Sequence, residues 1–203
     1  MDAAPLGPDF FARPVLRVAR DLLGRRLVRV LNGERLALRI VETEAYAGAD
    51  DPASHARGGP TARNRVMFGP PGHSYVYLVY GLHHCLNLVC EREGRAAAVL
   101  LRAGEPEEGL ERMAALRAGR PRRDWARGPG RLCAALGLDL RHDGLALPHA
   151  ELWLEPGRPP GRGRVEAGPR VGVDYAGEAA GWPWRFKEKA SPGRAAPSAG
   201  RRR

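Results

Sequence analysis

Two acidic side chains in a run typical of a β-strand are the residues best placed for chemistry. Glu42 and Glu44 stand two positions apart within residues 36–46, and side chains two apart on a strand point to the same side. They continue an apolar parity that ends at the ring of Tyr46. Carboxylates rarely occupy such positions unless they are paired or functional. Desolvation and a neighbouring like charge would raise a carboxyl pKa toward the range of a general base. The alternative is a pair of structural salt bridges to arginines.

The spacing of the two carboxylates suggests a class of reaction. Side chains that share a face of a strand lie roughly 6.5–7 Å apart at neighbouring positions. That separation is similar to the carboxyl spacing of inverting glycosidases, which leaves room for a water molecule. An O- or N-glycosidic bond is therefore a natural target, because both bonds break through a sugar cation that a carboxylate stabilises.

A second group of residues could bind flat ligands. Residues 74–80 alternate like a strand and hold three of the five tyrosines. Tyr75 and Tyr77 share a parity and would form an aromatic platform. Tyr80 falls out of step beside the turn residue Gly81, where it could act as a wedge. Flat aromatic side chains near arginines suit unstacked nucleobases, whereas the alternative interpretation places all three rings in the core.

Composition points to an acidic partner in a reducing compartment. The net charge is +10 and the pI is near 10.5, and nucleic acid is the commonest partner of so basic a chain. Cys85, Cys90 and Cys133 show no CxxC spacing, which favours free thiols in the cytoplasm and argues against a disulfide scaffold or a zinc ribbon. No apolar run approaches the ~20 residues that span a bilayer, so we expect no membrane association. A Schiff-base mechanism is disfavoured, because the only lysines are Lys187 and Lys189.

The surrounding pattern predicts an α+β fold in one domain over residues 1–190, followed by a basic, disordered tail over 191–203. We expect a curved, mostly antiparallel sheet flanked by helices, with a protruding β-hairpin. The expected helices cover residues 9–23, 105–117 and 131–136, and the expected strands cover 26–31, 36–46, 74–80, 85–90, 96–102, 152–154 and 170–173.

Several local features refine this pattern. Asp9 is expected to cap the first helix, and Pro106 to lie in the first turn of the second. The polar, turn-rich loop over 47–72 is long enough to indicate a function. In the hairpin, a three-residue loop over 81–83 would place Tyr77 opposite Asn87 and bring Asn87 onto the tyrosine face.

At this point the chain resembles a known family, the alkyladenine (3-methyladenine) DNA glycosylases. Seven segments match in order: VETEAY at 41–46, SHARGG at 54–59, TARNRVMF at 61–68, YVYLVYG at 75–81, VLLRA at 99–103, GPGRLC at 128–133 and RVGV at 170–173. Together they cover roughly residues 10 to 186. Each segment is weak alone, but seven in register make chance very unlikely.

The resemblance implies that the protein is a monomeric, monofunctional enzyme that needs no cofactor or metal. Members of the family insert a hairpin into the minor groove of double-stranded DNA, flip out a damaged purine and hydrolyse its N-glycosidic bond. Such purines include 3-methyladenine, 7-methylguanine and hypoxanthine. The enzyme leaves an abasic site. The resemblance also implies that the protein is located at the nucleoid in the cytoplasm.

The family's roles carry over onto matching positions. Glu44 resembles the general base that activates the attacking water, and Arg102 the arginine that holds this water and the carboxylate. The flipped base would lie against Tyr46, His55 and Tyr77, with Asn87 excluding the exocyclic amine of guanine. Tyr80 matches the wedge that fills the vacated stack.

Other signals are weaker. Gly128 and Gly130 precede a helix, where backbone N–H groups together with Arg131 could contact a DNA phosphate; an ordinary loop is the alternative. His83 and His84 lack the second ligand pair that a metal site needs, and they replace aromatic residues found in some relatives.

Two other functions fit parts of the pattern. A basic nucleic-acid-binding module could use the tyrosine platform without chemistry. A carbohydrate hydrolase could use Glu42 and Glu44, although the strong positive charge argues against it.

Overall fold

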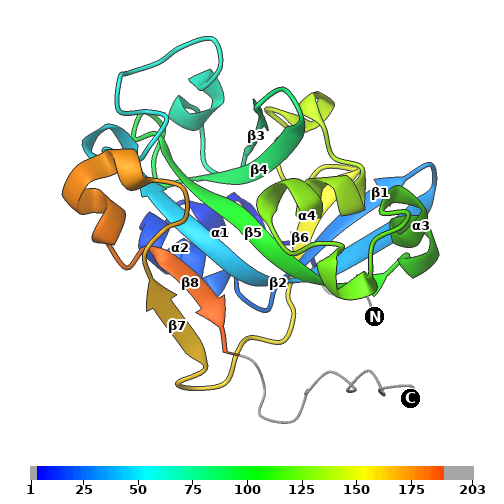
Figure 1. Cartoon of the computed structure of the whole chain (residues 1–203). Coiled ribbons are helices and arrows are strands. Elements are labelled where there is room, and N and C mark those ends of the chain that lie inside the picture. Colours follow the sequence, from blue (N-terminus) through cyan, green and yellow to red (C-terminus); the bar gives the residue numbers. More distant parts are fainter. Residues whose placement is uncertain (1–3, 190–203) are drawn as a thin grey trace.

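The computed structural model describes residues 4–189, so the expected tail over 191–203 lies outside the described residues. An eight-stranded sheet with the strand order β3-β4-β5-β2-β1-β6 organises these residues, while β8 pairs with β2 and β7 pairs with β8. All of its strand pairs are antiparallel. Helix α4 lies in front of the sheet, and α1 and α2 lie behind it (Figure 1). The α+β prediction is confirmed.

The strands are β1 (Arg26–Leu31), β2 (Glu34–Ala47), β3 (Ser74–Val79), β4 (His83–Cys90), β5 (Ala97–Glu108), β6 (Leu152–Glu155), β7 (Val165–Gly168) and β8 (Arg185–Glu188). The α-helices are α1 (Pro8–Phe11), α2 (Val15–Asp21), α3 (Leu110–Leu116) and α4 (Pro129–Leu136). Short 3-10 helices are η1 (Gly48–Asp50), η2 (Arg65–Phe68), η3 (Arg122–Asp124), η4 (Leu140–His142) and η5 (Asp174–Gly181).

The expected first helix is two helices. Pro14 separates α1 from α2 and serves as the N-cap of α2, because a proline lacks the N–H that a continuous helix needs and disfavours helical geometry in the residue before it. Asp9 lies inside the first turn of α1, and its expected role as the cap is wrong. The expected apolar face of α2 is confirmed, since Val15, Val18 and Ala19 are buried.

The second helix begins later than expected, because strand β5 continues to Glu108. Its acidic end pairs with β2, and Arg39 and Arg35 of β2 bind the carboxylates of Glu105 and Glu108. Pro106 is tolerated here because β4 pairs only with residues 97–100 of β5. The expected position of Pro106 in a helical turn is therefore wrong, and only the later part of the predicted helix forms α3.

The expected strand over 170–173 is also wrong. Residues 170–173 form a bend that leads into η5, and Gly172 adopts φ +74° within it. The strands in this part of the chain are β7 and β8, on either side of that bend. The bend places Val171 against β2, where its backbone has a role in the site.

The tyrosine hairpin forms with a register two residues from the expected one. Tyr77 pairs with Cys85, and Tyr75 pairs with Asn87. The three-residue loop covers 80–82, one position earlier than expected, and Tyr80 (φ 52°) begins it. Because a shift of two residues preserves the face of a strand, Asn87 still lies on the tyrosine side.

A large apolar core fills the space between the helices and the sheet. Leu22, Leu38, Leu88 and Leu101 are fully buried within it. The three cysteines are free and buried, as expected for reduced thiols. Among the described residues, no helix is long and apolar enough to cross a bilayer.

Candidate active site

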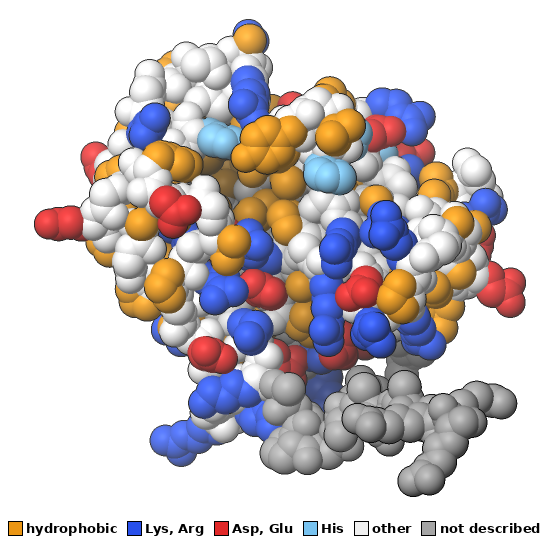
Figure 2. All heavy atoms as spheres, viewed as in Figure 1, with side chains coloured by type: hydrophobic (Ala, Val, Ile, Leu, Met, Phe, Trp, Pro, Cys, Tyr) orange, Lys and Arg blue, Asp and Glu red, His pale blue; other side chains and the backbone are white. Residues whose placement is uncertain are grey.

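A cavity of about 490 Å³ opens beside the tyrosine hairpin. Figure 2 shows it as a hollow with an apolar floor on the front face of the molecule. Strands β2 to β5, the loop over 47–72 and the bend over 170–173 each supply part of its wall. The long loop therefore helps to build a cavity, as its length suggested.

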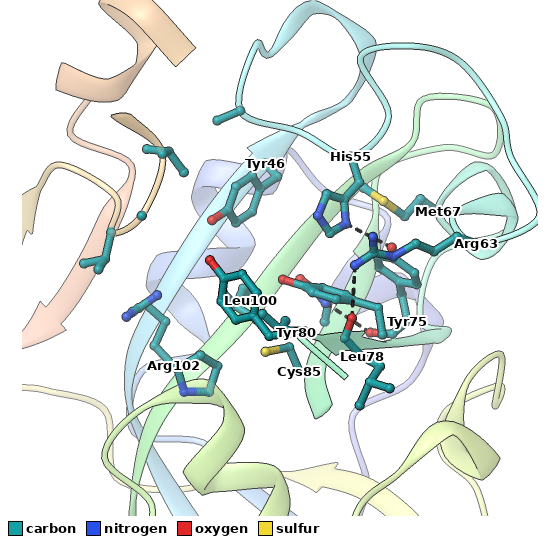
Figure 3. A pocket seen from close by; sticks show the side chains of 18 of the residues that line it. Tyr46, His55, Arg63, Met67, Tyr75, Leu78, Tyr80, Cys85, Leu100 and Arg102 are labelled. Carbon is teal, nitrogen blue, oxygen red and sulfur yellow. Dashed lines mark hydrogen bonds between the residues drawn. The ribbon is translucent and has the colours of Figure 1, made fainter. Parts of the chain in front are cut away.

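The four expected base-binding residues meet in this cavity. Tyr46, His55, Tyr77 and Asn87 all line it, and Figure 3 shows the rings of Tyr46 and His55 at its edge. The His55 ring lies 4.5 Å from the Tyr77 ring, with the two planes inclined by 72°. His55 Nδ1 lies 3.0 Å from the hydroxyl of Tyr75, and Asn87 Nδ2 donates to the Tyr75 carbonyl at 3.1 Å. The sequence motifs thus converge on one aromatic slot.

Burial keeps the walls of the slot uncharged. The pKa of His55 is lowered by burial and by the nearby Arg63, so its imidazole stays neutral. Burial raises the pKa of Tyr75 to about 12, and it raises the pKa of Tyr46 and of Tyr77 further. Neutral aromatic faces attract a cationic or electron-poor ring more strongly than an imidazolium would.

Glu44 lies directly behind this slot. Its side chain is 0% exposed, whereas the general-base role that the family resemblance implies needs a carboxylate that a water molecule can reach. Three groups cover it: the Tyr46 hydroxyl donates to Oε2 at 2.9 Å, Arg102 Nη1 donates to Oε2 at 3.1 Å and the Val171 N–H donates to Oε1 at 2.8 Å. All three covering residues line the cavity. One layer of protein therefore separates the carboxylate from the slot.

Two opposite effects act on the pKa of Glu44. Burial raises the pKa of its carboxyl, and this is the largest effect; Arg102, the Val171 N–H and the Tyr46 hydroxyl lower it in part. The direction agrees with the expectation from desolvation. Because the net effect is upward, the structure tunes this carboxyl toward the range of a general base.

Glu42 shares the face of Glu44 but has different surroundings. Arg102 Nε contacts Glu42 at 3.3 Å, so one guanidinium reaches both carboxylates. Arg185 Nη1 also contacts Glu42, at 3.2 Å. Glu42 thus matches the salt-bridge interpretation, while Glu44 combines ion pairing with burial beside the cavity.

Tyr80 lies at the exposed end of the hairpin. Its side chain is 92% exposed, and that of the neighbouring Leu82 is 76% exposed. Two large apolar groups in solvent at the rim of a cavity are unusual and mark an interaction surface. The position suits the expected wedge.

Helix α4 packs against the hairpin close to its turn. A Cβ atom on Gly130 would lie 2.9 Å from Cβ of His83, so only glycine permits the observed packing. Pro129 lines the cavity, and Arg131 is 55% exposed with its Nη1 3.9 Å from Asp124. His83 therefore packs against the start of α4. Within residues 4–189, no three His, Cys, Asp or Glu side chains gather as metal ligands would.

Some lining residues carry no role in the sequence analysis. Arg63 lies over the Tyr77 ring, 5.1 Å from its centre, and Cys85, Val171 and Tyr175 line the cavity. Three of these four stand in or beside the motifs quoted for the resemblance. Val171 acts through its backbone N–H, which no side-chain pattern indicates.

The comparisons with known proteins agree with this geometry. A model of the family described as Methylpurine-DNA glycosylase (MPG) matches residues 9–192. The chain is 56% identical over 186 residues to a protein of Methanocella arvoryzae, covering 91% of this chain and 92% of that one. It is 52% identical over 189 residues to a Streptomyces avermitilis protein (91% and 88% covered) and 45% identical over 194 residues to one from Alkaliphilus oremlandii (90% and 95% covered). All three are named "Putative 3-methyladenine DNA glycosylase".

A buried carboxylate behind an aromatic cavity, in a basic protein with these relatives, defines a DNA glycosylase, a hydrolase of N-glycosyl bonds. More particularly, the chain belongs to the methylpurine-DNA glycosylase family, whose model spans nearly all of it. This membership favours hydrolysis over the two alternative functions, binding without chemistry and cleavage of carbohydrates.

Proposed function

We propose that the enzyme excises damaged purines of the 3-methyladenine, 7-methylguanine and hypoxanthine type from double-stranded DNA, as a cytoplasmic monomer. The observation that carries the proposal is the placement of Glu44 one layer behind a slot lined by aromatic rings. A purine inside a duplex cannot reach such a slot, so the nucleotide must leave the stack.

In this mechanism, Tyr80 enters the duplex and fills the gap left by the extruded nucleotide. Unstacking a nucleotide costs a few kcal/mol, and this cost is lowest for a damaged pair. The difference favours lesions over normal bases. The flipped purine lies among Tyr46, His55 and Tyr77, and Asn87 limits the room for an exocyclic amine. The Gly130 N–H group and the guanidinium of Arg131 face the backbone phosphates. The expected contact through the Gly128 N–H is not available, because that group donates to the Arg102 carbonyl at 2.9 Å.

The chemical step follows from the charges around Glu44. Of the three covering groups, the Tyr46 hydroxyl is the one on a side chain that stacks on the substrate. Its release from Glu44 opens the path for a water molecule. The water oxygen bonds to C1′ of the deoxyribose, the C1′–N bond breaks with its electrons going to the purine, and Glu44 takes the water proton. The anionic carboxylate also stabilises the positive charge that develops on the sugar.

Leaving-group chemistry separates two kinds of substrate. A methylated purine cation departs as a neutral base without acid catalysis. Hypoxanthine needs a proton, which a water molecule or a pocket group must supply. Excision of methylated purines should therefore depend less on acid than excision of hypoxanthine.

The test is Glu44→Gln, with Glu42→Gln as the matched control on the same face of β2. We expect E44Q to lose at least ~100-fold in single-turnover release of free base from methylated duplex DNA, since general base catalysis contributes about 10²–10⁴-fold. Binding to the same duplex should persist. E42Q should retain excision within about tenfold of the native rate, because Glu42 only supports Arg102. Full activity of E44Q would refute the assignment of the base.

A further inference from the structure

A buried ion pair lies behind the cavity wall and has no role in the mechanism above. Asp51 and Arg170 both have side chains that are 0% exposed. Both terminal nitrogens of the Arg170 guanidinium, Nη1 and Nη2, donate to the two Asp51 oxygens in a fork geometry, with Nη2 to Oδ1 at 2.9 Å. A buried pair of this kind is expensive to desolvate and is weak support for a purely stabilising role.

The pair joins three segments that build one wall of the cavity. The Asp51 carboxylate accepts the N–H groups of Ala47 and Ala53, at 3.2 and 3.0 Å. Arg170 donates to the carbonyls of Ala45 at 3.0 Å and Ala179 at 3.3 Å. The pair therefore fixes the end of β2, the loop after it and η5 relative to one another.

Arg170 also touches the groups that hold Glu44. Its guanidinium lies over the Tyr46 ring, 4.8 Å from the centre, and over the Trp184 ring at 5.0 Å. The Tyr46 hydroxyl donates to Glu44. The residue that follows Arg170 in the chain, Val171, donates its N–H to the other oxygen of Glu44. Two of the three donors on Glu44 thus depend on the position of Arg170.

We propose that Arg170, held by Asp51, is a positioning residue that sets the orientation of Glu44 and Tyr46 for hydrolysis. The inference rests on the proposed role of Glu44 as the base. The guanidinium suits the task because its planar fork binds a carboxylate and stacks on an aromatic face at the same time. A lysine would keep the charge and lose both geometries.

The test compares Arg170→Met and Arg170→Lys in the full-length enzyme. We expect R170M to release methylated purines ~100-fold more slowly in single turnover, since misplacement of a catalytic group by about 1 Å costs that much. R170K should recover part of the loss. Affinity for damaged duplex should stay within about threefold, because the hairpin and the exposed arginines remain.

A pH profile separates positioning from general destabilisation. The charged and titratable groups around Glu44 are Arg102 from β5, Tyr46 and Glu42 from β2, and Arg185 from β8. Loss of the Val171 N–H and Tyr46 bonds should move the acid limb of the rate profile of R170M and R170K to higher pH. Unchanged rates and an unchanged acid limb in both variants would overturn the inference.

The matched control is Arg29→Met. Arg29 is buried to a similar degree and pairs with Glu151 at 3.1 Å beside a different cavity. R29M should lose thermal stability without moving the acid limb, and an equal shift in R29M would assign the effect to destabilisation and overturn the inference. If R170M does not fold, R170K alone decides by the same criteria.

The E44Q variant, measured in parallel, separates the two proposals. If E44Q is active, the role of Glu44 as the base is refuted. If E44Q is inactive while R170K keeps the native rate and pH profile, only the positioning role of Arg170 is refuted.

Discussion

At the scale of single residues, the carboxylate of Glu44 is held by three donors directly behind the cavity wall. Burial favours its protonated form, whereas three donors favour its ionised form. Together these influences leave the pKa of Glu44 above its ordinary value. The ion pair with Arg102 nevertheless stabilises the ionised carboxylate. A group in this balance can be ionised near neutral pH and still accept a proton from water during the reaction.

The raised pKa of Glu44 predicts the acid limb of the pH–rate profile. A base works only when ionised, so excision should fall as pH drops through this pKa, at a pH above the value of about 4.3 for an ordinary glutamate. Tyr46→Phe removes a donor that lowers the pKa of Glu44. The limb of Y46F should therefore move to higher pH by about half to one unit, the size expected for one hydrogen bond.

Single-turnover excision from methylated duplex at subsaturating enzyme, measured across pH, checks this, because that rate reports the pKa of the free enzyme, in which Tyr46 donates to Glu44. The control is Tyr175→Phe, because the Tyr175 hydroxyl donates to the Ala53 carbonyl and not to Glu44. A shift toward lower pH in Y46F, or an equal shift in Y175F, would contradict the assignment of the limb to Glu44.

Side-chain motifs indicated many of the residues that meet at the cavity, whereas the exposure of Glu44 to solvent depends on a backbone group. The strand alternation placed Glu42, Glu44 and Tyr46 together, and Arg102 reaches both carboxylates as the shared face requires. The complete covering of Glu44 could not be predicted, because one of the groups that cover it is the N–H of Val171 at a bend. Backbone donors leave no trace in residue type.

At the scale of elements, the hairpin and α4 form one unit. Gly130 allows His83 to pack directly on the start of the helix. The wedge at Tyr80 is three residues from that contact, so the direction in which the hairpin projects depends on it. The close approach of these two elements explains why a glycine is required inside the first turn of a helix, where alanine would otherwise be favoured.

Replacing Gly130 with alanine should therefore displace the hairpin. Overpacking at a site of this kind costs about 1–3 kcal/mol of unfolding free energy, offset by up to about 1 kcal/mol from helix propensity. We expect G130A to melt at a lower temperature and to flip damaged bases less well, as seen in stopped-flow fluorescence of a base analogue beside the lesion. Gly181→Ala is the control, since a Cβ atom there meets no atom within 4 Å. Native flipping by G130A would contradict the coupling.

Two elements of the fold differ from what their local sequence patterns predict. Glu105 and Glu108 favour a helix by composition, yet β2 is long enough to pair with them and its arginines bind them. The pattern at 170–173 suggests a strand, but Gly172 bends the chain there. Pairing with a distant strand and a positive φ angle are tertiary features that override local propensity.

At the scale of the whole molecule, the excess of positive charge sets how the enzyme meets DNA. Each phosphate neutralised by a side chain releases counterions, so affinity should fall steeply with salt. Arg131 belongs to α4, which begins at the cavity-lining Pro129 and lies in front of the sheet, whereas Arg17 belongs to α2, which lies behind it (Figure 1). Only the first of these should contribute to the salt dependence of binding.

Arg131→Gln should lower the log–log slope of affinity against salt by about one unit. Arg17→Gln, an exposed arginine on the opposite side, should leave the slope unchanged. Titration of a labelled damaged duplex at several salt concentrations measures both. Equal slopes for R131Q and the native enzyme would remove Arg131 from the proposed phosphate contacts.

The burial of the three thiols has a consequence for an enzyme whose substrates arise from methylating chemicals. Those electrophiles attack proteins as well as DNA, and the thiolate is the protein nucleophile they meet most readily. Burial raises the pKa of Cys85, Cys90 and Cys133, so the three thiols stay protonated. Cys85 lines the cavity, whereas Cys90 and Cys133 lie in the apolar core. The fold thereby makes Cys90 and Cys133 poor targets for the agents whose damage the enzyme removes.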